Sequence, residues 1–194
     1  MPERDIRRFV ASKEKWITNK LAVSQERSQR QRVFELNYGD TIMLRGKTRI
    51  ITAATGTPPG FCGDSLYLPP NLRSDQIKSA CIKLYRVAAK DYLPGRVDLY
   101  AMRMGISPEI IRINSAKKRW GSCSSKGSIN FSWRLIIASD DVIDYVVVHE
   151  LAHLTQMNHS LRFWSSVEKI LPDYRERRQL LRELEIKLSA QSWD

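Results

Sequence analysis

The sequence predicts an α+β fold, and three observations support this prediction. Between Phe34 and Pro70, short runs of β-forming residues alternate with turns rich in glycine, proline, asparagine and aspartate. Segments with apolar residues at helical spacing flank this region on both sides. A segment around residue 150 is apolar on nearly every side, which is typical of a helix buried inside a protein.

The length favours one compact unit. A chain of 194 residues with 42% hydrophobic residues can bury one sizeable core. Within it we expect an N-terminal part, residues 1–72, in which a helix and a small antiparallel β region pack on a larger part, residues 73–194. The first 32 residues are densely charged and interspersed with apolar residues, which predicts a helix there.

Four short runs follow the N-terminal helix, and we expect them to form the small antiparallel sheet. These runs are FELNY (34–38), TIMLRG (41–46), TRIITAAT (48–55) and SLYLPP (65–70). Helical spacing then extends from Ser74 to Met104, with Ser74 or Asp75 as the N-cap. Pro94-Gly95 is expected to divide this segment into two helices.

The second half of the chain alternates again between strands and helices. EIIRIN (109–114) and SINFSW (128–133) predict strands that pair with each other or join a common sheet. Acidic residues then mark the start of the buried helix DYVVVHELAHL. A further helix is expected at Leu161–Leu171 with Ser160 as its cap, and a charged helix completes the chain.

Composition limits the location and the partners. No stretch approaches the roughly 18 apolar residues of a membrane span, and the N-terminus is too charged for a secretory signal. Three cysteines, Cys62, Cys81 and Cys123, are widely spaced and read as reduced thiols. We therefore expect a cytoplasmic protein. The formal net charge of +11 would attract acidic proteins, nucleotides or nucleic acid through a basic surface.

The run HELAH at 149–153 carries the chemistry. His149 and His153 are four residues apart, so on a helix they lie one turn apart and can bind one ion. Neutral imidazoles suit Zn²⁺, and a catalytic zinc keeps a fourth position for water. Glu150 lies at the edge of the same helical face, where it can accept the proton of the attacking water. The motif predicts a hydrolase that uses one Zn²⁺ ion.

The third ligand has two candidates. His159 completes the only three histidines of the chain, all within eleven residues. On a straight helix it would lie about 15 Å beyond His149, so the chain must turn, and Asn158 in a left-handed conformation would allow this. Glu168, on the following helix, is the alternative. A chance HExxH on a structural helix is the competing interpretation, but buried histidines and a glutamate without a metal would be costly.

One long run resembles a known family: RWGSCSSKGSINFSWRLIIASDDVIDYVVVHELAHLTQMNHSLRFWSSVEKILPDY is similar to the YgjP-like metal-dependent hydrolases. These are zincin metallopeptidases related to the SprT-like zinc proteases, and the close match covers about residues 117–182. The resemblance implies a zincin-like metallopeptidase fold with a buried HExxH helix. It implies His149, His153 and His159 as zinc ligands and Glu150 as the catalytic acid/base.

The resemblance has limits. Gln156 stands where metzincins have glycine, so their sharp turn should not be transferred, and no cysteine follows Cys123 to form a zinc ribbon. The family fold places SINFSW (128–133) beside the cleft, where it could hold an extended peptide by backbone pairing. RWGSC (119–123) could bind a substrate carboxylate or phosphate, or could be a purely structural loop.

The resulting prediction is a zinc-dependent hydrolase, most simply a metallopeptidase acting on peptides or proteins. The alternative is hydrolysis of a nucleotide or other phosphorylated small molecule. A binding module with a structural zinc is a third reading, against which Glu150 argues because structural sites need no adjacent base. Transition-state stabilisation requires a donor, and Tyr145, Asn158 and Arg119 are the candidates. Phe163 and Trp164 are expected to brace the loop that carries His159.

Overall fold

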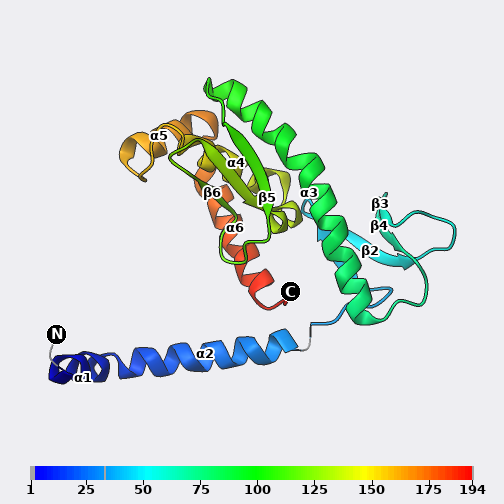
Figure 1. The fold of residues 1–194 in the computed structure, drawn as a ribbon, viewed down its shortest axis with the longest axis horizontal. Coiled ribbons are helices and arrows are strands. Elements are labelled where there is room, and N and C mark those ends of the chain that lie inside the picture. The colour runs from blue at the N-terminus through cyan, green and yellow to red at the C-terminus, as the bar shows by residue number, and fades with distance from the viewer. Residues whose placement is uncertain (1–2, 33, 194) are drawn as a thin grey trace. The chain divides into compact units, whose positions relative to one another are not determined.

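A computed structural model describes residues 3–32 and 34–193 (Figure 1). The chain forms two compact units, one made of Met1–Phe34 with Glu185–Asp194 and the other of Glu35–Leu184. The boundary expected between residues 72 and 73 stays a prediction. Among the described residues, no helical stretch combines the length and the hydropathy that crossing a lipid bilayer would require.

The N-terminal unit is helical, as predicted. It contains α1 (Glu3–Ser12) and α2 (Glu14–Arg32). Thr18 donates its hydroxyl hydrogen to the backbone oxygen of Glu14 one turn earlier. The rings of Phe34 and Trp193 lie 5.1 Å apart, so the segment that follows α2 contacts the C-terminal segment.

The first sheet is mixed and not wholly antiparallel. Its strands are β1 (Thr41–Leu44), β2 (Lys47–Ala53), β3 (Gly60–Cys62) and β4 (Ser65–Leu68), in the order β1-β2-β4-β3. β1 pairs with β2, and β3 with β4, antiparallel as expected. β2 and β4 run parallel, because the chain crosses to the outer position to form β3 and then returns beside β2.

FELNY (34–38) is irregular, so the strand predicted there is wrong. Side chains take up its backbone amides instead of a sheet ladder. The amide of Leu36 donates to Ser74 Oγ at 3.1 Å, and the amide of Asn37 donates to Asp40 Oδ2 at 2.7 Å. Asparagine and aspartate favour such local turns over strand pairing.

α3 (Ser74–Met104) is one continuous helix, so the break expected at Pro94 is wrong. The residues around it form a buried stripe, which includes Leu93 and Val97, and this packing outweighs the one backbone bond that proline removes. The predicted N-cap is off by one position. Arg73 precedes the helix, and its amide donates to Gln76 Oε1 at 2.9 Å. Gly105 ends the helix in the left-handed conformation with φ 66°.

The second sheet contains the two strands predicted in this region and one that was missed. The strands are β5 (Ile110–Asn114), β6 (Gly121–Cys123) and β7 (Ser128–Ser132), in the order β5-β7-β6. β5 and β7 pair in parallel, and β6 pairs antiparallel to β7. β7 therefore has a strand on each side, which overturns the proposal that 128–133 takes up an extended peptide.

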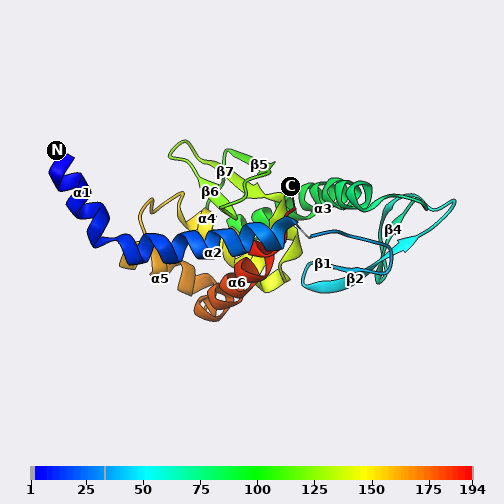
Figure 2. The same ribbon diagram turned by 90° about the horizontal axis from the view of Figure 1, so that it is seen from below.

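One short 3₁₀ helix and three α-helices follow the second sheet. They are η1 (Trp133–Ile137), α4 (Asp140–Ala152), α5 (Leu161–Ile170) and α6 (Tyr174–Ser189). α4 packs against β6 on one side and α5 on the other, and Figure 2 shows it between the second sheet and α5. α3 contacts η1, α4 and β5. The α+β fold class and the buried HExxH helix are thus confirmed.

Two ion pairs hold the first half of α4. Arg45, in the turn between β1 and β2, donates to both carboxylate oxygens of Asp140 at 2.8 and 2.7 Å. Arg96 on α3 donates to both oxygens of the buried Asp144 at 2.7 Å, and Tyr100 adds a bond at 2.8 Å. Because Asp144 is almost fully desolvated, these charge-assisted bonds fix α4 against α3.

Candidate metal centre

The end of α4 positions the first two histidines. His149 lies in the last turn, and His153 is the residue that caps the helix. Valine and leucine side chains around α4 are buried, so the helix cannot rotate without exposing the core. The Nδ1 atom of His153 lies 3.0 Å from the backbone oxygen of Gln156. A hydrogen on Nδ1 makes this bond, which fixes the ring and leaves Nε2 able to bind a metal.

The chain turns directly after His153 and brings His159 back. The amides of Leu154 and Thr155 bond to carbonyls three residues earlier, at Leu151 and Ala152, which closes the helix with a tight turn. Arg45 and Asn71 are the only non-glycine residues with a positive φ among those that the structure describes. The left-handed conformation predicted for Asn158 is therefore wrong. Ser160 then caps α5, accepting a bond from the amide of Phe163 as predicted.

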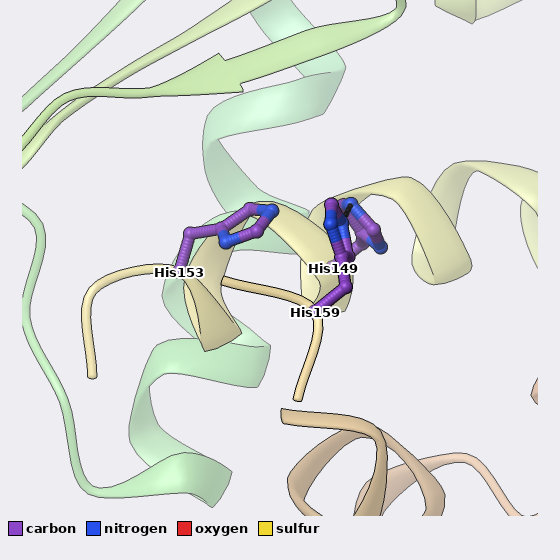
Figure 3. Close-up of side chains that lie close together, drawn as sticks. All are labelled: His149, His153 and His159. Atoms are coloured by element: carbon purple, nitrogen blue, oxygen red, sulfur yellow. Dashed lines mark hydrogen bonds between the residues drawn. The ribbon is translucent and has the colours of Figure 1, made fainter. Parts of the chain in front are cut away.

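The three histidines converge. Their ligand atoms all lie within 4.8 Å of one another, and Figure 3 shows the rings gathered at the end of α4. Nε2 of His149 and Nε2 of His159 are 3.1 Å apart. Two nitrogens on one tetrahedral zinc would lie roughly 3.3 Å apart, given Zn–N bonds of about 2.0–2.1 Å. The geometry therefore suits one shared cation.

Burial favours the neutral form of His149 and His159. Desolvation, together with the neighbouring His153, His159 and Arg178, lowers the pKa of His149 to about 3. The pKa of His159 is also lowered, first by burial and then by the charges of His153 and Arg178. A neutral ring keeps the lone pair that a metal requires. Nδ1 of His149 is buried and has no hydrogen-bond partner among the described residues, whereas its Nε2 lies near His159 and is the nitrogen available to a metal.

An aromatic wall supports the histidines from α5. Phe163 is fully buried, and its ring centroid lies 5.0, 4.6 and 4.7 Å from those of His149, His153 and His159. Trp164 stacks on His159 with an interplanar angle of 26° and on Tyr174 with one of 18°. Phe163 and Trp164 thus contact the histidines, and Phe163 lies in the core as expected, while their bracing role stays a prediction.

Glu150 faces β6. The residue is only 6% exposed, and burial raises the pKa of its carboxyl to about 7, while the positive charge of Arg119 opposes this rise. A Cβ built on Gly121 would lie 2.6 Å from both Cγ and Oε1 of Glu150. Strand β6 can therefore lie this close to the carboxylate only because residue 121 has no side chain.

The alternative third ligand points to a different partner. Glu168 accepts a hydrogen bond from Arg175 at 3.0 Å and does not belong to the histidine group. Of the three oxyanion candidates, Tyr145 lies with its ring centroid 5.9 Å from that of His149, and the charge of Arg119 acts on Glu150. Asn158 is exposed in the loop before His159.

The sequence did not reveal Arg178 on α6. Its guanidinium lies 5.2 Å from the ring centre of Trp164, and its charge acts on His149 and His159. The residue follows His159 by 19 positions on a helix with many arginines, so nothing in the pattern distinguishes it. Gly121 did carry a signal, since a glycine in a strand often marks a close approach.

The donor set fits a divalent metal that imidazoles prefer. Three nitrogens that converge with a carboxylate alongside match a catalytic site, in which three protein ligands leave one position open. A structural zinc would need a fourth protein ligand. The described residues place only the three histidines in this group. The same imidazoles would also accept Ni²⁺, Co²⁺ or Fe²⁺, so the ligand type alone does not select zinc.

The solved structures that resemble part of this chain include two metallopeptidase zymogens. The metallopeptidase zymogen abylysin of Pyrococcus abyssi is 26% identical with a TM-score of 0.44, over 50% of this chain and 94% of that protein. The metallopeptidase zymogen jannalysin of Methanocaldococcus jannaschii is 19% identical with a TM-score of 0.43, over 50% and 96%. No curated protein matches the chain.

The family comparison covers far more of the chain. A family model described as the YgjP-like metallopeptidase domain matches residues 1–184. The match includes the N-terminal helices, the first sheet and the whole histidine group. Together with the HExxH helix and the returning His159, it confirms the zincin-like fold class and a metal-dependent hydrolase. The chain belongs to the YgjP-like metallopeptidase family.

Proposed function

We propose that the protein is a zinc-dependent peptidase in which His149, His153 and His159 hold the ion and Glu150 is the general base. The observation that carries this proposal is the convergence of three imidazole nitrogens within 4.8 Å, immediately beside a buried carboxylate. A bound zinc supplies Lewis acidity to a peptide carbonyl and to an attacking water. Membership of a metallopeptidase family favours peptide bonds over phosphate esters.

Glu150 moves the proton. It follows the first candidate ligand directly, so its side chain starts from the same turn of α4 but projects to one side of the histidine face. In this role Glu150 accepts a proton from the water as it attacks and passes it to the leaving amine. The backbone of Gly121 lies against this carboxylate and restricts its movement, which supports a single productive position.

The free edge of β6 is our proposed site for the peptide backbone. The amide of Ser132 donates to the carbonyl of Trp120, and the amide of Ser124 donates to the carbonyl of Ser128. Every second residue of this segment, which includes Ser122 opposite Asn130, therefore points its backbone groups toward β7. Gly121 and Cys123 therefore turn their backbone N–H and C=O groups away from β7. An extended substrate could add to these groups as a further antiparallel strand.

Two other expectations remain proposals. A cytoplasmic location is supported by three free cysteines. Association with nucleic acid rests on the net charge of +11 alone. Hydrolysis of a phosphorylated small molecule is the alternative function, and an assay of nucleotide hydrolysis tests it.

The experiment compares wild type with Glu150→Gln, both loaded with zinc and checked for metal content. Peptide hydrolysis should fall by about 100-fold or more, as expected for loss of a general base, while the metal is retained. Glu168→Gln on α5 is the matched control and should keep full activity. Cleavage of nucleotides but not of peptides would support the alternative function. Equal rates of hydrolysis for wild type and Glu150→Gln in every assay would refute the proposed catalytic role of Glu150 and favour a binding role for the protein.

A further inference from the structure

A polar pocket lies on the second sheet, next to the strand that faces Glu150. It is small, with a volume of about 30 Å³, and its lining comes from all three strands and from the loop before β6: Asn114, Ala116, Arg119, Gly121, Ser122, Asn130 and Ser132. The register pairs Asn114 with Ser132 and Ser122 with Asn130, so their side chains share one sheet face. Ile129 and Phe131 are buried on the opposite face, towards the helices.

The pocket offers several hydrogen-bond donors. Oδ1 of Asn114 accepts the amide of Ala116 at 3.0 Å, and the N–H groups of this side chain remain available to donate. The Ser132 hydroxyl donates its hydrogen to the backbone oxygen of Ala116 at 2.8 Å, so it cannot donate to a ligand. Arg119 adds a guanidinium, and no acidic residue lines the pocket. Such a donor set recognises an anion with several acceptor oxygens.

The surrounding loop adds to the positive charge. Residues 115–127 contain Lys117, Lys118, Arg119 and Lys126 and no aspartate or glutamate. The space that the pocket offers to bound groups is about 30 Å³, which is room for a group of the size of one or two water molecules. It can therefore take the charged group of one side chain or chain end but not a whole nucleotide. The chemistry and the size together indicate a carboxylate.

Gly121 connects this pocket to the candidate catalytic residue. It lines the pocket, and the direction in which its Cβ would point is occupied by the Glu150 carboxylate. A peptide that extends β6 projects successive side chains to opposite faces of the sheet. If one side chain faces the metal, its neighbours face the side on which the pocket lies.

We propose that this pocket selects substrates by binding a carboxylate of the peptide through Arg119, Asn114, Ser122 and Asn130. The proposal rests on the proposed peptidase function and adds to it the class of substrate, namely peptides with an acidic side chain or a free C-terminal carboxylate near the scissile bond. Arg119 is a specificity residue in this arrangement. A charge-assisted hydrogen bond of this kind corresponds to a preference of roughly tenfold or more.

The test uses blocked peptides in which a single glutamate is moved along a neutral sequence, each matched with its glutamine counterpart. A second pair compares a free with an amidated C-terminus, which separates the two sources of the carboxylate. For wild type, the ratio of kcat/KM between the charged and neutral members should be about tenfold or more at one position, or at the C-terminus. Arg119→Gln should bring this ratio close to one. Lys118→Gln removes the same charge from the same loop but not from the pocket lining, and should leave the ratio within about twofold.

Binding to the metal-free protein makes the test independent of turnover. Fluorescence anisotropy with labelled glutamate and glutamine peptides should show the same preference, lost in Arg119→Gln and reversed in Asn130→Asp. If no peptide is cleaved but this preference is present, the peptidase proposal fails and the pocket assignment stands. Equal binding and equal kcat/KM for every charged and neutral pair would overturn the pocket assignment. An equal loss of preference in Lys118→Gln and Arg119→Gln would also overturn it, because the effect would then come from the general field of the loop.

Discussion

The carboxylate of Glu150 packs against the backbone of Gly121, so closely that a methyl group on residue 121 would lie 2.6 Å from Oε1. This contact joins two parts of the chain, strand β6 and helix α4, which carries two of the candidate metal ligands. It makes the position of the candidate general base depend on a residue that does not react.

Gly121→Ala should therefore inactivate the enzyme without removing the metal. The new methyl group forces the carboxylate to shift, and a displacement of about 1 Å from the productive position can reduce turnover by about 100-fold. Steady-state peptide hydrolysis and metal analysis on the same sample would measure this. Gly95→Ala is the control, since its Cβ meets no atom within 4 Å and alanine suits its helix. Full activity of Gly121→Ala would show that Glu150 tolerates the shift.

The third ligand can be identified by thermal unfolding with and without zinc. A ligand that binds only the folded state raises Tm, and loss of one protein ligand weakens that effect. His159→Ala should lose most of the zinc-dependent rise, because its Nε2 lies 3.1 Å from that of His149. Glu168→Ala should keep the rise of wild type, since its carboxylate bonds Arg175. The reverse pattern would assign Glu168 as the ligand.

The aromatic wall should matter for metal affinity as well as for stability. Phe163→Ala removes a fully buried ring and should reduce the free energy of unfolding by about 3–5 kcal/mol. Because this ring contacts all three histidines, zinc affinity should also fall, and Phe163→Leu should show a smaller effect of both kinds. Leu66→Ala creates a cavity beside the first sheet and should reduce the free energy of unfolding but not the zinc affinity. Unchanged zinc affinity in both Phe163 variants would argue against the bracing role.

The ion pair at the start of α4 should make stability depend on pH. The hydrogen bonds from Arg45 lower the pKa of Asp140 below its usual 3.8, and Tyr92 adds to this. A lowered pKa in the folded state stabilises the protein above the unfolded pKa, and this contribution is lost as the pH falls through the folded value. The coupling energy of an Arg45→Gln and Asp140→Asn double-mutant cycle should thus be favourable at pH 7 and should decline as the pH falls below the usual carboxyl pKa of 3.8. A coupling energy that stays constant over this range would contradict the assignment.

The convergence of the candidate metal ligands was predictable because their pattern is local. His149, Glu150 and His153 share one helix, and the periodicity of an α-helix fixes their relation before any tertiary contact is known. His159 required only that the chain turn, and the cap at Ser160 marks where the next helix begins. Even so, the expected left-handed Asn158 was wrong, because the turn is closed by bonds to Leu151 and Ala152.

What the sequence did not reveal depends on contacts between distant segments. Strand β6 contains three residues within a loop rich in glycine, serine and lysine, and it exists because β7 offers a partner. Pro94 reads as a helix breaker until the buried stripe of α3 is known. The pocket beside Arg119 brings together residues from three strands, so no spacing in the sequence could indicate it.

The brevity of strand β6 has a consequence for the kinds of protein that could serve as substrates. In β6 the peptide groups of Gly121 and Cys123 alone point away from β7, so few main-chain hydrogen bonds are available to a substrate. These few bonds cannot offset the free energy needed to unfold a structured segment of a target protein. Tightly folded domains should therefore resist cleavage, whereas loose termini and long flexible loops would be cut first. Limited proteolysis of one target in its native and denatured forms would expose that difference.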